Sequence, residues 1–154
     1  MINVRENLLN ITNKLLTAGL NHGATGNCSC RDRGGYLITP SGVDSSKLTS
    51  DMMVRMNLSD SLYQPESKYQ PSSEWQFHQA ILKKYPDINA VVHTHSVFAS
   101  TLSALGQDIP AFHYMIAVAG GDSVRCAPYA MFGTKELSDN ILEAIQDRKA
   151  CLLS

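Results

Sequence analysis

The sequence has almost no excess of charge and no long apolar run. Its 13 lysines and arginines nearly balance 14 aspartates and glutamates, which gives a formal net charge of −1. Nucleic-acid and membrane-surface binding commonly need clustered basic residues, and the densest basic pair here is Lys83–Lys84. No segment approaches the ~20 apolar residues of a membrane span. We therefore expect neither a nucleic acid nor a membrane among the partners.

The four cysteines include no C-x-x-C pair, which excludes that spacing of thiolate metal sites and redox motifs. The first ten residues, MINVRENLLN, have no long apolar stretch and no cleavage signal of a secretory leader. We therefore expect a cytoplasmic protein whose buried thiols stay reduced.

What is present is a chain of 154 residues, 44% of them hydrophobic, enough for one globular domain over residues 1–154. Apolar periodicity predicts helices from residue 4 to residue 16 or 20, from a Ser73 cap to Pro86, over 97–105, and from about Thr134 onward. It predicts strands at 28–31, 36–39, 51–58, 88–95, 124–127 and 149–154, with a loop over 59–74. Because a regular β-α-β rhythm is missing, we predict a single layered α/β/α domain with a central, mostly antiparallel sheet.

Two imidazoles interrupt the stretch AVVHTHSVFA, residues 90–99, which otherwise predicts a buried strand. Side chains at positions i and i+2 of a strand share a face, so His93 and His95 should stand side by side. Three interpretations are open: histidines satisfied by hydrogen bonds in the core or at an edge, acid–base catalysis, and a metal site.

A metal site needs a further ligand, and Glu74 is the nearest plausible carboxylate. We place Glu74 at the first helical position after Ser73, where the helix dipole favours the ionised form that binds metal. On its own, it is an ordinary first-turn glutamate. Its helix leads through Pro86 directly into the histidine strand, so the two segments should pack together and form a Glu/His/His cluster.

Three short polar turns accompany this cluster: TGN at 25–27, PSG at 40–42 and PSS at 71–73. Such turns can offer backbone N–H groups and hydroxyls to an anion, although each one alone is an ordinary turn. Together with a candidate metal site, they suggest a small phosphorylated substrate.

The segments TGNCSCR, GYLITPSG, PSSEWQFH, AVVHTHS and HYMIAVAGG…CAPYAMFGT follow one another in the order found in the class II aldolase/adducin family, which this sequence resembles over nearly its whole length. PSSE together with HTH is specific for the metal-dependent members. HYMIAVAGG resembles the branch that acts on L-fuculose 1-phosphate.

The resemblance implies one zinc ion per subunit, held by Glu74, His93, His95 and a third histidine. It implies substrate and phosphate contacts from three pairs of residues: Gly26 and Asn27, Ser41 and Gly42, and Ser72 and Ser73. It also implies that Glu74 doubles as the catalytic base and that Tyr114 reaches the active site of a neighbouring subunit in a homotetramer, where it acts as a catalytic acid.

The implied reaction is the reversible cleavage of a ketose 1-phosphate, such as L-fuculose 1-phosphate, to dihydroxyacetone phosphate and lactaldehyde. In the family, the third zinc histidine follows the LL strand in an H-G motif, and this chain ends at Ser154. We therefore expect that a C-terminal part is missing. Alternatives on the same scaffold are a sugar-phosphate 4-epimerase and a rhamnulose-1-phosphate type of aldolase; an alternative of another class is a non-catalytic, adducin-like interaction module.

Overall fold

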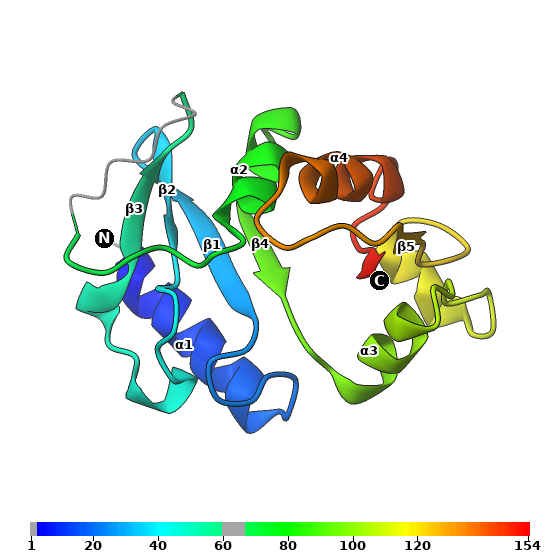
Figure 1. The fold of residues 1–154 in the computed structure, drawn as a ribbon, viewed down its shortest axis with the longest axis horizontal. Coiled ribbons are helices and arrows are strands. Elements are labelled where there is room, and N and C mark those ends of the chain that lie inside the picture. Colours follow the sequence, from blue (N-terminus) through cyan, green and yellow to red (C-terminus); the bar gives the residue numbers. More distant parts are fainter. Residues whose placement is uncertain (1–2, 60–66) are drawn as a thin grey trace. The chain divides into compact units, whose positions relative to one another are not determined.

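The computed structural model of the chain describes residues 3–59 and 67–154 (Figure 1). They belong to two compact units, residues 1–95 and residues 96–154. The boundary of a single domain over 1–154 stays a prediction. Pro65, in the predicted loop 59–74, lies outside the described residues. Among the described residues, no helix is long and apolar enough to cross a membrane.

The first unit combines two α-helices, two 3-10 helices and one sheet. Its elements are α1 (Val4–Thr17), β1 (Asn27–Asp32), β2 (Gly35–Ile38), η1 (Ser45–Lys47), η2 (Ser50–Met52), β3 (Val54–Asn57), α2 (Trp75–Lys84) and β4 (Ala90–His93). Helix α1 begins after Asn3, whose side chain accepts a hydrogen bond from the backbone N–H of Arg5. This cap satisfies one of the free N–H groups at the start of the helix, which begins at residue 4 as predicted.

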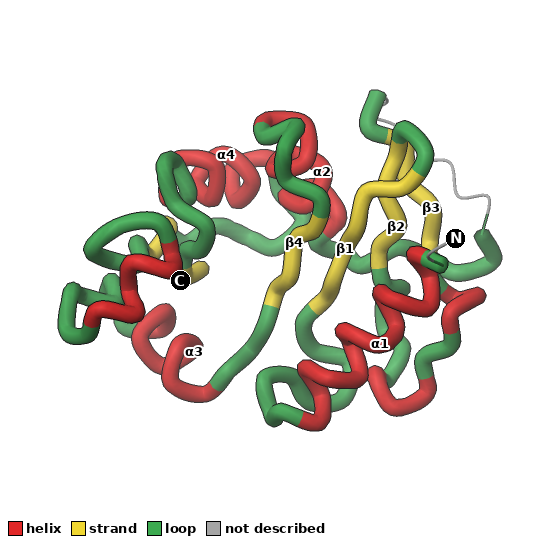
Figure 2. Tube along the Cα trace, turned by 180° about the vertical axis from the view of Figure 1, so that it is seen from behind, coloured by secondary structure: helices red, strands yellow, loops and turns green. Residues whose placement is uncertain are grey.

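The four strands form one antiparallel sheet in the order β3-β2-β1-β4 (Figure 2). Strand β1 pairs with β2 on one edge and with β4 on the other, and Asn27 lies opposite His93 in the β1–β4 pair. The predicted antiparallel arrangement is therefore confirmed. The register places the start of β1 beside the end of β4, where the first histidine stands.

Alternation along the strands sends side chains to two different helices. On one face, Leu8 of α1 packs in a cluster with Cys28, Leu37 and Met53. On the other face, Leu82 of α2 packs in a cluster with strand residues of the opposite parity, namely Tyr36, Ile38, Val54 and Met56. The unit is thus a three-layer α/β/α arrangement with α1 and α2 on opposite faces of the sheet.

The end of α2 is tied to β1 by one side chain. The Arg31 guanidinium donates to the backbone carbonyls of Leu82 and Tyr85 at the C-terminal turn of α2 and, over 2.6 Å, to that of Ile88. A cation at this position also suits the negative end of the helix dipole. Arg31 thereby fixes where α2 ends relative to the sheet.

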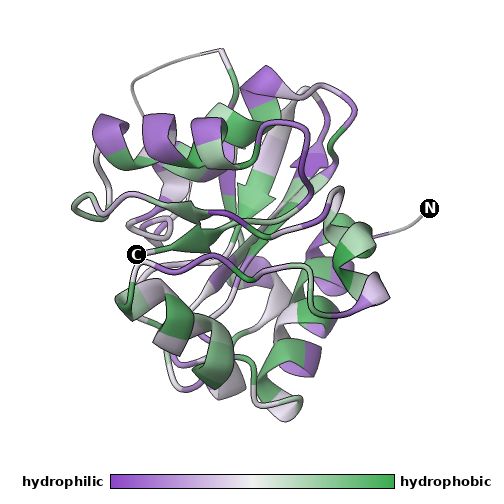
Figure 3. Cartoon of the chain, turned by 90° about the vertical axis from the view of Figure 1, so that its right-hand side faces the viewer, coloured by the Kyte–Doolittle hydropathy of each residue, from purple (hydrophilic) through white to green (hydrophobic). Residues whose placement is uncertain are grey.

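The second unit contains two α-helices, a 3-10 helix and a two-stranded parallel ladder. Its elements are α3 (Val97–Ala104), η3 (Tyr114–Ala119), β5 (Cys126–Ala127), α4 (Lys135–Ala144) and β6 (Leu152–Leu153). Thr134 caps α4 by accepting from the N–H of Leu137, as predicted. Figure 3 shows β6, next to the C-terminus, in the colour of hydrophobic residues.

Three local expectations were wrong. Strand β4 is not buried: its residues alternate between exposed and half-buried, because within this unit it is an edge strand with only β1 beside it. The strand also ends at His93, so His95 lies in the following loop. At α2, the cap is Glu74 rather than Ser73, and the helix begins at Trp75.

The core on the α2 side of the sheet gives a stability prediction. Leu82 is 1% exposed, so Leu82→Ala should leave a cavity and lower the free energy of unfolding by about 2–5 kcal/mol. Lys84→Ala on the same helix is the matched control and should change it by less than about 0.5 kcal/mol, since Lys84 is exposed. Urea denaturation of the three proteins measures both effects. Equal losses in the two variants would contradict this packing.

Candidate active site

The site lies where α2 begins and β4 ends. Glu74 is the N-cap residue of α2, and its backbone N–H donates to the Ser72 hydroxyl over 3.3 Å. The N-cap is therefore Glu74 and not the expected Ser73. Ser72 stabilises the turn that leads into the helix, since its carbonyl also accepts from the Trp75 N–H over 3.1 Å. The carboxylate of Glu74 is left to reach across to the strands.

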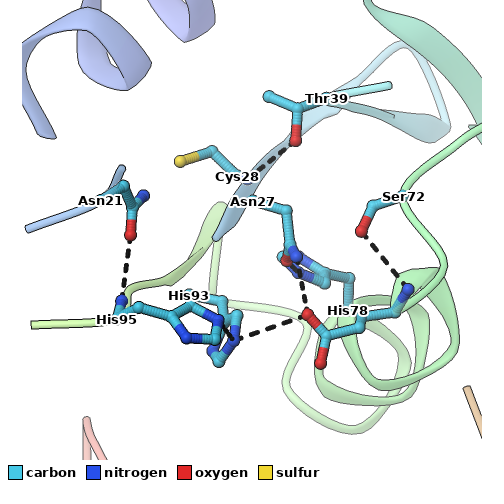
Figure 4. Close-up of polar contacts among 9 residues, drawn as sticks. Asn21, Asn27, Cys28, Thr39, Ser72, His78, His93 and His95 are labelled. Atoms are coloured by element: carbon cyan, nitrogen blue, oxygen red, sulfur yellow. Dashed lines mark hydrogen bonds and ion pairs between the residues drawn. The ribbon is translucent and has the colours of Figure 1, made fainter. Parts of the chain in front are cut away.

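The His93 and His95 rings lie side by side (Figure 4), and His93 is also close to Glu74. The Nε2 atom of His93 lies 3.5 Å from Oε2 of Glu74 and 3.0 Å from Nε2 of His95. The backbone N–H of His95 is held by the side-chain oxygen of Asn21 and by the carbonyl of Leu20, both at 3.0 Å. The loop after β4 is thereby folded so that the second ring meets the first.

Burial controls the protonation of His93. Desolvation lowers the pKa of the His93 imidazole; the nearby Glu74 carboxylate opposes this and the His95 ring adds to it. The neutral form, which offers a lone pair to a metal ion, is therefore favoured at neutral pH.

Two of the distances between the donor atoms are close to those expected around a bound metal ion. Two ligand atoms on a tetrahedral zinc ion, with bonds of about 2.0–2.1 Å, lie about 3.3–3.4 Å apart. The measured 3.5 and 3.0 Å bracket this value. Across residues 3–59 and 67–154, however, no group of three or more histidine, cysteine, aspartate or glutamate side chains is placed so that it could hold a metal ion. Glu74, His93 and His95 thus supply suitable chemistry without a fully formed coordination shell.

The three polar turns meet around Thr39. Its hydroxyl accepts from the Cys28 N–H over 3.2 Å, and its carbonyl accepts from the Ser72 N–H over 3.0 Å. The Ser41 N–H donates to the Gln70 carbonyl, and Pro40 and Pro71 form a β-bridge. Because the N–H groups of Ser41 and Ser72 are used between the loops, the hydroxyls are the donors these two residues can offer to an anion.

The glycines and Tyr114 complete the predicted set. Gly26 has φ +69°, and a Cβ atom there would lie 2.4 Å from the Asn21 side chain, so a larger residue does not fit. Gly42 also has φ +69° but faces open space. The Ser73 side chain is exposed. Tyr114 begins η3 in the second unit, and its side chain is 80% exposed. Its catalytic role stays a prediction, as do the roles of the other site residues.

Sequence reasoning missed the buried residues behind Glu74. His78 is fully buried, and its ring nitrogens contact Ser29 and Asn27. The Nδ2 group of Asn27 in turn donates to Oε2 of Glu74 over 2.8 Å. The spacing of these residues in the sequence could have revealed them. His78 follows Glu74 by four positions, the spacing of neighbours along a helix. Asn27 and Ser29 are two positions apart, so they share one face of their strand.

With the geometry in hand, the chain can be compared with known proteins. The family model described as the class II aldolase and adducin N-terminal domain matches residues 6–154. The chain therefore belongs to the class II aldolase/adducin family, as its motifs indicated. The match covers both compact units.

Two aldolases are similar in sequence to this chain. The chain is 50% identical over 135 residues to the L-fuculose phosphate aldolase of Escherichia coli K12, covering 88% of this chain and 61% of that protein. It is 47% identical over 153 residues to a 5-methylthioribulose-1-phosphate/5-deoxyribulose-1-phosphate aldolase of Rhodospirillum rubrum, covering 99% of this chain and 68% of that one. The chain thus spans about two thirds of these relatives' lengths.

A solved structure shows the same fold. A structure titled L-fuculose 1-phosphate aldolase superposes with a TM-score of 0.90 at 39% sequence identity, covering 98% of this chain and 71% of that one. This likeness confirms the predicted class II aldolase-like α/β fold with an antiparallel sheet.

The buried imidazole makes stability depend on pH. Desolvation, with a smaller contribution from His93, lowers the pKa of His78 from 6.5 to about 3. Between these values the unfolded chain binds a proton at residue 78 and the folded chain does not. Acidification through this range should therefore decrease the free energy of unfolding, by up to about 1.4 kcal/mol per pH unit.

Urea unfolding at several pH values in this range measures that slope. His78→Gln cannot titrate there, so its slope should be smaller than that of the unmodified chain by up to the same amount. Parallel slopes for the two proteins would contradict a buried neutral His78.

Proposed function

We propose that the protein containing this chain is a zinc-dependent aldolase that reversibly cleaves a ketose 1-phosphate to dihydroxyacetone phosphate and an aldehyde. The observation that carries the proposal is the pair of close approaches of His93 Nε2, which lies 3.5 Å from Glu74 Oε2 and 3.0 Å from His95 Nε2. Glu74 directly precedes α2, and its backbone N–H bonds to Ser72 of the polar loops. Membership of the class II aldolase/adducin family supports the reaction type.

L-Fuculose 1-phosphate is the first candidate substrate, with lactaldehyde as the second product. The similarity to the Escherichia coli L-fuculose phosphate aldolase supports it. A 5-deoxypentulose 1-phosphate is the second candidate, because the Rhodospirillum rubrum relative matches 99% of the chain. Cleavage between C3 and C4 of a 5-deoxypentulose 1-phosphate leaves acetaldehyde, so the aldehyde released separates the two candidates.

Glu74, His93 and His95 would hold the zinc ion. When bound, the ion supplies Lewis acidity to the carbonyl of the substrate. The hydroxyls of Ser41, Ser72 and Ser73, the Asn27 amide, and the backbone at Gly26 and Gly42 bind and orient the phosphate. Contacts to a part of the substrate that does not react contribute to rate by positioning the part that does.

Two residues move protons. In the direction of aldol addition, the Glu74 carboxylate removes a proton from C3 of dihydroxyacetone phosphate, and that carbon then forms the bond to the aldehyde carbon. The aldehyde oxygen becomes a hydroxyl by taking the proton of the Tyr114 phenol. Cleavage runs the same transfers in reverse, so Glu74 protonates C3 and Tyr114 receives the hydroxyl proton.

Tyr114 performs this step for a neighbouring subunit in a homotetramer. Large apolar side chains gather in and just before η3 and are strongly exposed: Phe112 by 73%, Met115 by 54% and Val118 by 62%. Exposed apolar patches of this kind commonly mark protein–protein contacts. The balanced net charge and the family suit a cytoplasmic enzyme of sugar breakdown, such as the degradation of fucose.

A panel of ketose 1-phosphates tests the function. The zinc-loaded protein should release dihydroxyacetone phosphate, followed by a coupled reduction, together with lactaldehyde or acetaldehyde according to the substrate. Glu74→Gln is the variant that tests the role of the carboxylate. It keeps the shape of the side chain but cannot accept the C3 proton, so turnover should fall by about 10²–10⁴-fold, with substrate affinity largely kept. Unchanged turnover would remove Glu74 from the mechanism.

Zinc binding tests the ligand set. Gel-filtered protein should retain one zinc ion per chain by metal analysis, and His93→Ala should lose most of it. His113→Ala, at a histidine of the second unit outside the proposed ligand set, should retain the metal. Full zinc content in His93→Ala would contradict ligation by this residue.

A further inference from the structure

Four polar side chains form a continuous hydrogen-bonded chain that ends on Glu74. The Ser29 hydroxyl lies 2.7 Å from Nδ1 of His78, and Nε2 of His78 lies 2.5 Å from Oδ1 of Asn27. The Nδ2 group of Asn27 then donates to Oε2 of Glu74 over 2.8 Å. The exposed fractions of Ser29, His78 and Asn27 are 1%, 0% and 6%, so water does not compete for these bonds.

The hydrogen bonds along these four side chains can run in only one donor-to-acceptor direction. An ionised Glu74 accepts hydrogen bonds and cannot donate, so Asn27 must turn its NH₂ group toward it and its carbonyl toward His78. The Nε2 atom of His78 must therefore carry the ring proton. Its Nδ1 atom is left as an acceptor, and the Ser29 hydroxyl, which can donate or accept, then donates to it.

The imidazole is not needed for packing. It stacks on Phe77, with ring centroids 4.5 Å apart, a contact that an apolar side chain could also make. Burying a polar ring costs free energy unless both nitrogens are bonded; here both are bonded, and the Nε2 bond leads through Asn27 to Glu74. Groups that hold a metal-binding side chain from behind have this arrangement, and losing one weakens metal binding.

We propose that His78 is a positioning residue that orients the Asn27 amide and, through it, the Glu74 carboxylate. A turn of the amide by 180° would place its carbonyl oxygen against the carboxylate, and the two would repel. The Nε2–H group of His78 adds to this barrier, because the turn would also take away its acceptor. The inference deepens the proposed function and rests on it, because it concerns the proposed metal ligand Glu74.

Two substitutions at residue 78 separate orientation from packing. His78→Leu fills the space but cannot donate to Asn27, so the dissociation constant for zinc should rise about 10- to 100-fold. His78→Gln places an amide N–H near the position of Nε2, so its constant should stay within about tenfold of the unmodified chain. Competition with a chromophoric chelator measures zinc affinity in all three proteins, and thermal unfolding confirms that each is folded.

A second measurement needs no metal. Long-range ¹H–¹⁵N correlation of the ring nitrogens should show His78 as the pure Nε2–H tautomer in the unmodified chain. Ser29→Ala removes the partner of Nδ1 but leaves the Nε2–H bond to Asn27, so the Nε2–H tautomer and the zinc affinity should both be kept. A His78 ring that is Nδ1–H, or a mixture of tautomers, in the unmodified chain would overturn the proposal.

The outcomes distinguish the inference from the function. Zinc binding that is equal in the unmodified chain and His78→Leu overturns the positioning role but leaves the zinc site intact. Equal weakening in His78→Leu and His78→Gln also overturns it, since the donor would then not matter. Absence of zinc binding by the unmodified chain counts against the proposed function, and the tautomer measurement then decides whether the hydrogen-bonded chain exists. If neither variant at residue 78 folds, the tautomer and Ser29→Ala decide the question.

Discussion

The register between β1 and β4 is the constraint on which the site depends. It sets Asn27 opposite His93, on the face of the sheet that α2 covers. Since alternation then places Ser29 and Val91 on that same face, the helix meets polar side chains at one end of the strands and apolar ones further along. A shift by one residue would turn Asn27 and Ser29 toward α1 and leave Glu74 without its hydrogen-bond donor.

Polar and apolar packing divide the α2 interface between them. Leu82 joins the hydrophobic cluster with Tyr36 and Ile38, while His78, one turn earlier, bonds to Asn27 and Ser29. Burial of apolar area stabilises the contact without fixing its direction. The hydrogen bonds supply direction, because a donor and an acceptor must face each other. Apolar burial thus stabilises the α2 interface, and the hydrogen bonds orient the Glu74 carboxylate.

Much of this could be predicted from the sequence, and the failures have physical reasons. The helices and the antiparallel sheet followed from periodicity and chain order, and so did the approach of Glu74 to His93, while the metal site itself stays a prediction. The burial of β4 was predicted from its apolar residues. Burial depends on what lies beside a strand, however, and composition does not show that. The His78–Asn27 contact joins residues 51 apart, so only the fold reveals it. Thr39 likewise acts through hydrogen bonds to two distant loops.

Helix α2 is held at both ends: Ser72 and Asn27 bond to Glu74 at its start, and Arg31 bonds to the carbonyls at its finish. A helix that is held at both ends cannot shift or rotate as a whole. Any change in the reach of the carboxylate during a catalytic cycle is then confined to rotations about the bonds of its own side chain. Such rotations exchange the hydrogen bond from Asn27 for another partner, so this acid can change partners without the scaffold having to move.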